Sequence, residues 1–299
     1  MKIDNALILC AGFGTRMGPI GEVLPKPLWP VFEKTLLELQ IRFVKELGCK
    51  KIFINAHHRA QDLREFVQDL NHGDVELVFE PEILGTGGAV HSIASKLNYQ
   101  GSFLYLAADQ FYFFDQSYLL QALDLIKEHP VALFGLEFDK ESSYADLEIE
   151  NGLLKNIIKQ KVGPGVTFSG MALVDLAQLK KSSGYSGFFE SVCRYQEDEI
   201  PVVMPEGEYV DWGSGSRYYR GMFDLLKGTP ESFYKFCSKW GAFDQEKMNQ
   251  GFYGPSRSLI NLTASDIDAS AKAIVLKKGA VKVKKNGLYF ENIIDEFPV

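Results

Sequence analysis

LCAGFGTRMGPIGEVLPKPL, residues 9–28, is the stretch that decides the fold of this chain. It overlaps a continuous apolar run, ALILCA (6–11), which is what a strand buried on both faces of a sheet looks like. Gly12 and Gly14 follow at once, and glycines there let backbone N–H groups approach a phosphate chain closely. A buried first strand that runs into a glycine loop therefore predicts an α/β fold with a phosphate site.

The rest of the stretch adds two cations to the glycines. Arg16 carries a planar guanidinium suited to phosphate oxygens. Lys26 lies between Pro25 and Pro27, whose rings restrict the backbone and should hold the lysine in place. Together these residues predict a cradle for a triphosphate.

Two common phosphate motifs do not fit. A dinucleotide fingerprint needs a third glycine where this chain has Met17, which weakens an oxidoreductase reading. A Walker loop needs G-K-[ST], which does not follow here. Because a glycine turn after a first strand is common by itself, the prediction of a phosphate-binding site depends on Arg16 and on the Pro25-Lys26-Pro27 segment.

Strand-like and helix-like segments alternate over the first two hundred residues. A hairpin is expected over 146–159, around Asn151-Gly152, and another strand over 167–175. The pattern predicts a doubly wound, mostly parallel but mixed sheet with a Rossmann-like arrangement. The expected strands are 6–11, 50–56, 75–80, 102–109, 131–138 and one late strand within 200–213, and the expected helices are 35–47, 60–70, 87–97, 116–128 and 215–227.

The last seventy residues have a different character. Residues 231–260 are rich in aromatic side chains and are expected to be helical or irregular, and 273–293 contains short β-rich pieces separated by glycines. We find no repeat long enough to indicate a solenoid. We therefore expect one domain over 1–229 and a C-terminal appendage over 230–299.

Composition limits the classes of function. The chain has 299 residues, 46% hydrophobic and 24% charged, with a net charge of −7. An acidic chain is a poor candidate for sequence-independent binding of nucleic acid. No apolar run approaches the roughly 18 residues of a membrane span, and no leader is evident. The four cysteines show no CxxC spacing, so we expect reduced, mostly buried thiols in a cytoplasmic protein.

The pair of motifs GFGTRM (12–17) and PKPL (25–28) resembles the signature of the sugar-1-phosphate nucleotidyltransferases. The resemblance extends to about residue 228 and is nearest to bacterial mannose- and heptose-1-phosphate guanylyltransferases and N-acetylmuramate-1-phosphate uridylyltransferase. It implies a magnesium-dependent reaction of a nucleoside triphosphate with a sugar 1-phosphate, in nucleotide-sugar supply for the cell envelope. It also implies catalytic roles for Arg16 and Lys26 and nucleotide contacts from Ala11, Gly12, Gly14 and Thr15.

The same resemblance implies two metal-binding aspartates. Asp109 follows a central strand in YLAADQ, and Asp211 lies in YVDWGS, where Tyr209 and Ser214 replace a tryptophan and a threonine of the family pattern. Mg²⁺ on a triphosphate takes one or two carboxylates from the protein and its other ligands from phosphate and water. A lone aspartate at a strand end is more often a cap or turn residue, so the prediction depends on the pair.

Two further segments resemble parts of the family's nucleotide and substrate sites. In LGTGGAV (84–90), Thr86, Gly87 and Gly88 would contact base and ribose, although a glycine-rich helix start has the same appearance. In INAHHRAQDL (54–63), we expect a structural or substrate-edge role for the adjacent histidines rather than metal binding, because neighbouring strand residues point different ways.

The contact to the sugar phosphate is expected downstream of the hairpin. Lys161 in IIKQKVGP fits the family's lysine best and Lys159 is its rival, although the usual flanking glutamate and proline are missing. A solvated lysine pair is the alternative. Ser169 and Gly170, in FSGM, resemble the strand that borders the sugar.

Two rival functions remain open at this point. Cytidylyl transfer to phosphocholine would use the same loop with another acceptor, and a catalytically silent sensor would bind a nucleotide sugar without reaction. Retention of the two cations and two aspartates argues against the sensor. We expect UTP or GTP as nucleotide, since the chain has no glutamine of the thymidylyl type near residue 87, and neither nucleic acid nor membrane as partner. Homo-oligomerisation is left open.

Overall fold

The computed structural model describes residues 3–138, 144–159, 163–246, 259–263, 271–276 and 285–297. It divides the chain into two compact units. The first unit comprises residues 1–12, 43–107 and 114–207, and the second comprises 13–42, 108–113 and 208–299. The division expected at 229/230 stays a prediction, since the units combine segments from several parts of the chain.

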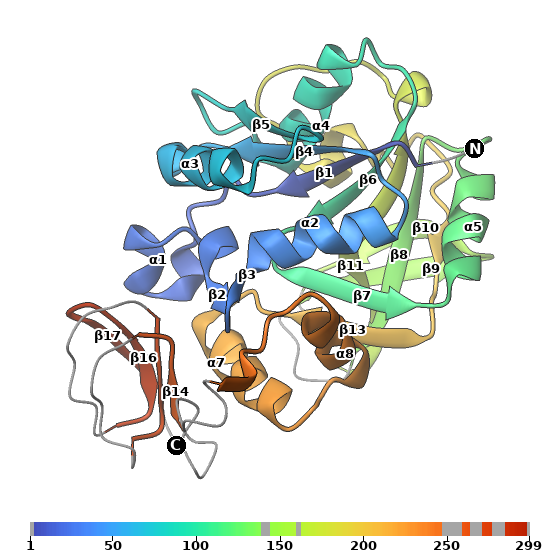
Figure 1. Ribbon diagram of the computed structural model, residues 1–299. Helices are drawn as coiled ribbons and strands as arrows, with labels where there is room; N and C mark the ends of the chain where they lie inside the picture. The colour runs from blue at the N-terminus through green and yellow to red at the C-terminus, as the bar shows by residue number, and fades with distance from the viewer. Residues whose placement is uncertain are drawn as a thin grey trace. The chain divides into compact units, whose positions relative to one another are not determined.

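A seven-stranded sheet forms the centre of the first unit (Figure 1). Strands β1, β4, β5 and β6 are parallel neighbours, β12 is parallel to β8, and β11 runs antiparallel between β6 and β8. This is the predicted mostly parallel, mixed sheet. In spatial order the strands are β12 (Val202–Val203), β8 (Val131–Phe138), β11 (Gly165–Asp175), β6 (Ser102–Ala107), β1 (Asn5–Leu9), β4 (Lys51–Ala56) and β5 (Val75–Phe79).

The predicted helices of this unit are also present. Asp115 caps α5 by accepting a hydrogen bond from the amide of Ser117, and Asn71 ends α3 in the left-handed conformation. Leu36–Glu46 forms α2, which crosses from the second unit into the first. The helices within the first unit are α3 (Ala60–Leu70), α4 (Gly85–Lys96), α5 (Gln116–Leu125) and the short α6 (Phe188–Ser191).

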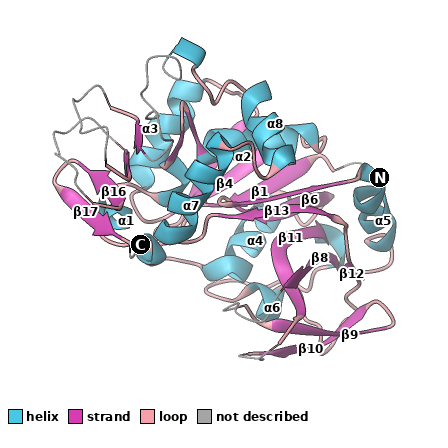
Figure 2. Cartoon of the chain, turned by 90° about the horizontal axis from the view of Figure 1, so that it is seen from below, coloured by secondary structure: helices cyan, strands magenta, loops and turns pink. Residues whose placement is uncertain are grey.

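The predicted hairpin consists of β9 (Asp146–Glu150) and β10 (Leu153–Ile158). Asn151 and Gly152 both have positive φ, as a tight two-residue turn requires. Figure 2 shows the hairpin apart from the main sheet, and β9 also contacts β11.

Apolar residues from the sheet and from α4 form the core of the first unit. Leu7, Phe103 and Val174 from the strands pack in one cluster with Val90 and Ile93 from α4, all five fully buried. Burial of each such side chain contributes about 1.5–3 kcal/mol relative to exposure. The continuous apolar runs in the sequence therefore correspond to strands covered on both faces.

The second unit contains the phosphate-loop segment and the C-terminal part of the chain. Its short helices are η1 (Thr15–Met17), α1 (Ile20–Val23) and η2 (Lys26–Leu28), and its longer ones are α7 (Gly215–Leu226) and α8 (Glu231–Lys239). Strands β7 (Gln110–Phe114) and β13 (Gly207–Asp211) pair with each other, as do β2 (Pro30–Val31) and β3 (Lys34–Thr35). Phe233 of α8 packs on Phe111 and Trp212, which gives this unit an aromatic core.

A four-stranded sheet ends the second unit: β14 (Leu259–Asn261), β15 (Ala273–Val275), β16 (Gly287–Phe290) and β17 (Ile293–Glu296). The first three are parallel, and β17 returns antiparallel to β16. The short β pieces predicted within 273–293 are thus confirmed. Of the stretch 231–260, α8 is helical as one alternative predicted, and 247–258 lies outside the described residues.

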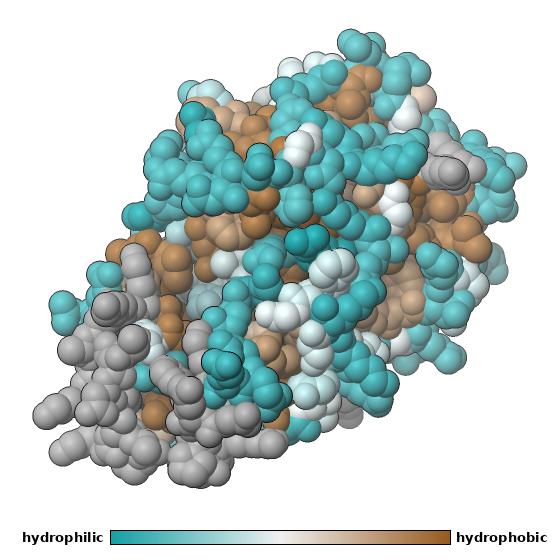
Figure 3. All heavy atoms as spheres, viewed as in Figure 1, coloured by the Kyte–Doolittle hydropathy of each residue, from teal (hydrophilic) through white to brown (hydrophobic). Residues whose placement is uncertain are grey.

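The surface is mixed in polarity. On the face shown in Figure 3, hydrophobic residues lie in separate patches between hydrophilic ones. Exposed large hydrophobic side chains include those of Phe13, Phe79 and Tyr185. In the described part of the chain, every helix is too short or too polar to cross a membrane.

Candidate active site

The glycine loop begins where β1 ends. A Cβ atom on Gly12 would meet no atom of the described residues within 4 Å, so their packing does not explain a glycine there. Gly14 has a φ of 67°, in the left-handed region that favours glycine, and it precedes η1. Thr15 and Arg16 are exposed, whereas Met17 is fully buried and anchors the loop. The loop thus leaves space beside Gly12 and presents a cation.

A buried neighbour positions Lys26. Trp29 is fully buried and donates from Nε1 to the Leu24 carbonyl oxygen at 2.9 Å, and its amide donates to the carbonyl oxygen of Lys26, also at 2.9 Å. Lys26 begins η2 between its two prolines, and its ammonium forms an ion pair with Asp109. The prolines and Trp29 fix the backbone, so the cation has a defined place.

The two-stranded ladder of β7 and β13 brings the two predicted aspartates together. Asp109 immediately precedes β7, Asp211 is the last residue of β13, and the amide of Trp212 donates to the Asp109 carbonyl oxygen at 3.1 Å. Their side chains are only 6% and 8% exposed. These residues are far apart in the sequence and become neighbours through a pairing that the sequence did not predict.

Gly213 marks the point on which the charged groups converge. A Cβ on this glycine would lie 2.7 Å from Asp211 Oδ1, 3.2 Å from Asp109 Oδ2 and 3.7 Å from Arg16 Nη1. Any side chain here would fill the space between the carboxylates. The second unit therefore holds two carboxylates and the Arg16 guanidinium around one small opening, with Lys26 paired to one of the carboxylates.

Arg217, on the first turn of α7, is a further member of this cluster. Its guanidinium pairs with Asp211, and its amide donates to Ser214 Oγ at 3.3 Å. Sequence reasoning missed it, because a single arginine near a helix start has no motif. Its distance of six residues from Asp211 was the only signal in the sequence.

The carboxylate pair fits a divalent cation that also binds phosphate. Two hard oxygen donors from the protein, with phosphate and water for the rest, match the usual Mg²⁺ arrangement. Among the described residues, no group of three or more His, Cys, Asp or Glu forms a closed metal cage. The donor set thus suits a cation that arrives with a triphosphate.

A buried polar chain in the first unit supports the start of the glycine loop. The amide of Cys10 donates to Asn55 Oδ1 at 2.8 Å, Asn55 Nδ2 donates to Glu80 Oε1 at 2.8 Å, and the amide of Leu84 donates to Glu80 Oε2 at 3.1 Å. Ala11, next in the chain, is buried. The ends of β1, β4 and β5 are thereby tied to the start of α4.

The glycines at the start of α4 lie against residues 184–191 of the first unit. The amides of Gly87 and Gly88 donate to the Ser186 carbonyl oxygen at 2.9 and 3.3 Å, and Thr86 Oγ1 accepts from the amide of Phe188 at 3.0 Å. A Cβ on Gly87 would collide with the Gly187 carbonyl oxygen. These contacts are a packing reason for the glycines, and contact with base and ribose stays a prediction.

His57 has a local partner as well. Its Nδ1 lies 2.9 Å from the Glu80 carbonyl oxygen, and neither His57 nor His58 belongs to a metal-binding group among the described residues. The structural or substrate-edge role expected for the pair stays a prediction.

The residues expected near the sugar lie on β11 and after β10. Gly170 has a φ of 82° at an irregularity in β11, and the Ser169 hydroxyl donates to the Phe134 carbonyl oxygen at 2.8 Å. Lys159 is exposed directly after β10, and Lys161 lies outside the described residues. The sugar-phosphate roles of Lys161, Ser169 and Gly170 stay predictions.

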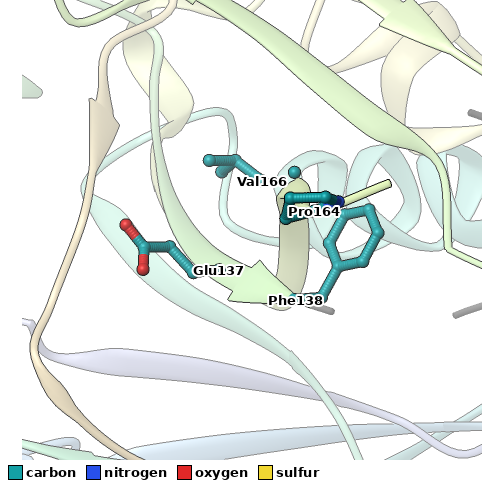
Figure 4. A pocket seen from close by; sticks show the side chains of 5 residues that line it. Glu137, Phe138, Pro164 and Val166 are labelled. Atoms are coloured by element: carbon teal, nitrogen blue, oxygen red, sulfur yellow. The ribbon is translucent and has the colours of Figure 1, made fainter. Parts of the chain in front are cut away.

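A hollow opens in the first unit where β8 ends and β11 begins. Its lining is Glu137, Phe138, Pro164, Gly165 and Val166, and its volume is about 450 Å³. Figure 4 shows the Phe138 ring beside Pro164, with the Glu137 carboxylate turned away from them. No cation is among the lining residues that the structure describes, whereas the cluster around Gly213 includes Arg16, so that cluster is the better described candidate for phosphate chemistry.

Known proteins resemble this chain in sequence and in fold. A family model described as nucleotidyl transferase matches residues 5–153. Over 221 residues the chain is 34% identical to the D-glycero-alpha-D-manno-heptose 1-phosphate guanylyltransferase of Campylobacter jejuni, an alignment that covers 69% of this chain and 97% of that protein.

Similarity extends to a larger eukaryotic protein. The chain is 28% identical over 232 residues to the mannose-1-phosphate guanylyltransferase catalytic subunit beta of Drosophila melanogaster, covering 73% of this chain. It spans only 62% of that relative's length.

Solved structures share the fold. HddC from Yersinia pseudotuberculosis, complexed with GMP-PN, superposes with a TM-score of 0.62 over 75% of this chain and all of that one. Its sequence identity is 20%, so the likeness is one of fold alone.

Proposed function

The chain belongs to the sugar-1-phosphate nucleotidyltransferases, and we propose that it joins the nucleotidyl group of GTP or UTP to a sugar 1-phosphate and releases pyrophosphate. One observation supports this most strongly. The two carboxylates and three cations of the charged cluster lie directly beside the glycine loop segment in the second unit. The cluster consists of Arg16, Lys26, Asp109, Asp211 and Arg217.

The reaction needs positioning and charge neutralisation more than acid–base chemistry. A phosphate oxygen of the sugar 1-phosphate attacks the α-phosphorus in line, and the bond from the α-phosphorus to the bridging oxygen breaks. The nucleophile is already an anion, so no general base has to remove a proton. The obstacle is the repulsion between two polyanions, which fixed cations lower.

For the residues that the structure describes, each role is supported by the residue's place, and the role of Lys161 follows from the family resemblance alone. Arg16 and the amides of the loop from Ala11 to Thr15 bind the β- and γ-phosphates. Lys26, on its rigid Pro-Lys-Pro backbone, neutralises charge at the α-phosphate. Asp109 and Asp211 would hold Mg²⁺, which when bound shields the triphosphate charge and stabilises the leaving pyrophosphate. Lys161 would orient the sugar phosphate.

The nucleotide is proposed from both sequence and similarity. Two relatives are named as guanylyltransferases, and the segment at 84–90 lacks the glutamine of thymidylyl enzymes. Thr86 and backbone groups would then select the base. A missing hydrogen bond to the base should cost a wrong nucleotide about 10²-fold or more in kcat/KM.

The test is pyrophosphate release with GTP, UTP, CTP, dTTP and ATP, each against mannose, heptose and N-acetylmuramate 1-phosphates and phosphocholine. We expect turnover with GTP or UTP and a sugar 1-phosphate, abolished by EDTA. Turnover only with CTP and phosphocholine would instead indicate a cytidylyltransferase that acts on an alcohol phosphate. Binding of a nucleotide sugar without any pyrophosphate release would make it a sensor.

A further inference from the structure

Arg217 engages the Asp211 segment with both its backbone and its side chain. The amide donates to Ser214, the N-cap of α7, and the guanidinium donates to Asp211 Oδ2. The other carboxylate oxygen, Oδ1, accepts from the amide of Gly213 at 2.6 Å. Both oxygens of Asp211 are therefore held, and the carboxylate has a single direction.

The ion pair between Arg217 and Asp211 offsets repulsion between buried carboxylates in the metal-free protein. Asp211 and Asp109 are almost fully buried and border the same point beside Gly213. Two buried like charges so close destabilise the fold unless each has a counter-charge. Lys26 supplies it for Asp109 and Arg217 for Asp211.

The two partners of this ion pair differ in exposure. The Arg217 side chain is 36% exposed, whereas that of Asp211 is 8% exposed. The arginine can therefore turn toward solvent while the carboxylate remains in place.

We propose that Arg217 is a positioning residue, a resident counter-ion that orients Asp211 and competes with a divalent cation for its carboxylate. The inference rests on the proposed function in that Asp211 is taken as a metal ligand. This inference predicts two effects of Arg217. The side chain stabilises the metal-free protein, and it lowers the affinity of the nucleotide-free protein for a divalent cation.

The test compares Arg217→Gln with Arg220→Gln, which removes the same charge from an exposed position on the same helix. Mn²⁺ binding to the nucleotide-free protein is measured by electron paramagnetic resonance, and thermal unfolding is recorded in EDTA and in saturating Mn²⁺. Arg217→Gln should bind Mn²⁺ about fivefold more tightly, the effect of losing a competing pair worth about 1 kcal/mol. Its Tm should be lowered in EDTA and should return to the wild-type value in Mn²⁺, and Arg220→Gln should change neither property.

A merely structural salt bridge would behave differently. The Tm deficit of Arg217→Gln would then persist in Mn²⁺ and its Mn²⁺ affinity would not rise, and either result overturns the proposal. If Arg217→Gln fails to fold, Arg217→Lys keeps the charge without the forked donors, and its Mn²⁺ affinity should lie above that of the wild type. These measurements use no substrate, so absence of pyrophosphate release would reject the proposed function without deciding this inference.

Discussion

At the scale of single residues, the charged cluster makes Lys26 the most informative position. Lys26→Ala should lower kcat by roughly 10²-fold, the usual effect of removing one positioned electrostatic group. It also leaves the buried Asp109 carboxylate without its cation, so Tm in EDTA should fall. Lys34→Ala, which removes a lysine paired with Glu38 in the same unit, is the matched control and should retain activity. Steady-state kinetics and thermal unfolding decide between these outcomes.

Asp109 provides the reciprocal experiment. Asp109→Asn should abolish pyrophosphate release at any Mg²⁺ concentration, because a neutral amide is a poor ligand for a hard cation. Asp124→Asn removes an exposed carboxylate elsewhere and should leave turnover unchanged. Full activity of Asp109→Asn in EDTA would remove the metal role from the proposal. The double variant Lys26→Ala/Asp109→Asn should regain thermal stability but not activity.

At the scale of elements, substitution of Gly12 in the glycine loop tests whether a glycine is needed for binding of the triphosphate or for folding. Gly12→Ala adds a methyl group into open space, so its Tm should match that of the wild type. The triphosphate, however, needs that space, and its KM should rise by at least tenfold. Gly73→Ala, at another glycine with no atom within 4 Å of the added Cβ, should change neither Tm nor KM. Equal kinetics for both variants would show that the triphosphate does not approach Gly12.

The contact between α4 and the segment 184–191 predicts a pH dependence. His91 lies in it, with one ring nitrogen 3.1 Å from the Tyr99 hydroxyl and the other 3.2 Å from the Ser191 carbonyl oxygen. Burial holds the pKa of His91 below its ordinary value of 6.5. The unfolded chain therefore binds a proton near pH 6.5 while the folded chain still excludes it, so stability falls as pH drops through this window.

Thermal unfolding between pH 8 and pH 5 measures this effect. The wild type should lose more Tm below pH 6.5 than His91→Gln, which has no titrating ring there. His129→Gln removes an imidazole outside this contact and should follow the wild-type curve. Parallel curves for wild type and His91→Gln would contradict the assignment.

The elements also show where sequence reasoning was sufficient. The strands of the first unit were predicted from short segments rich in apolar residues, of which β1 is nearly uninterrupted and β5 contains Glu76, and the hairpin because Asn151-Gly152 demands positive φ. The β7–β13 ladder was missed, since Gln110–Phe114 follows its preceding strand after only two residues and has no turn signal of its own. Without that ladder, the meeting of Asp109 and Asp211 rested on family resemblance, and Arg217 had no basis in the sequence.

At the scale of the whole molecule, the chain passes between its two units several times. One passage lies within α2, between Arg42 and Phe43, and another separates β6 from β7. Because α2 extends from one unit into the other, unfolding of one unit alone would break hydrogen bonds of this helix in the other unit. We therefore expect a single cooperative transition for the two units.

The cysteines can test this, because they are distributed over both units. Cys10, Cys49 and Cys193 lie in the first unit and Cys237 lies in the second, all buried and none in a disulfide. Burial raises the pKa of Cys49 to about 12 and holds the pKa values of Cys193 and Cys237 far above their ordinary range, so few thiolates exist in the folded protein.

Labelling with a thiol reagent should thus report unfolding at each site. In a urea series, peptide mass spectrometry after a short labelling pulse gives one midpoint for Cys193 and another for Cys237. If the units unfold together, the two midpoints coincide, and a bound triphosphate with Mg²⁺ raises both by the same amount. If Cys237 reacts at lower urea than Cys193, the second unit opens independently of the first. The chain crosses from one unit to the other within α2 and again between β6 and β7. These connections favour coincident urea midpoints, because a ligand that stabilises one end of a continuous helix also stabilises the other.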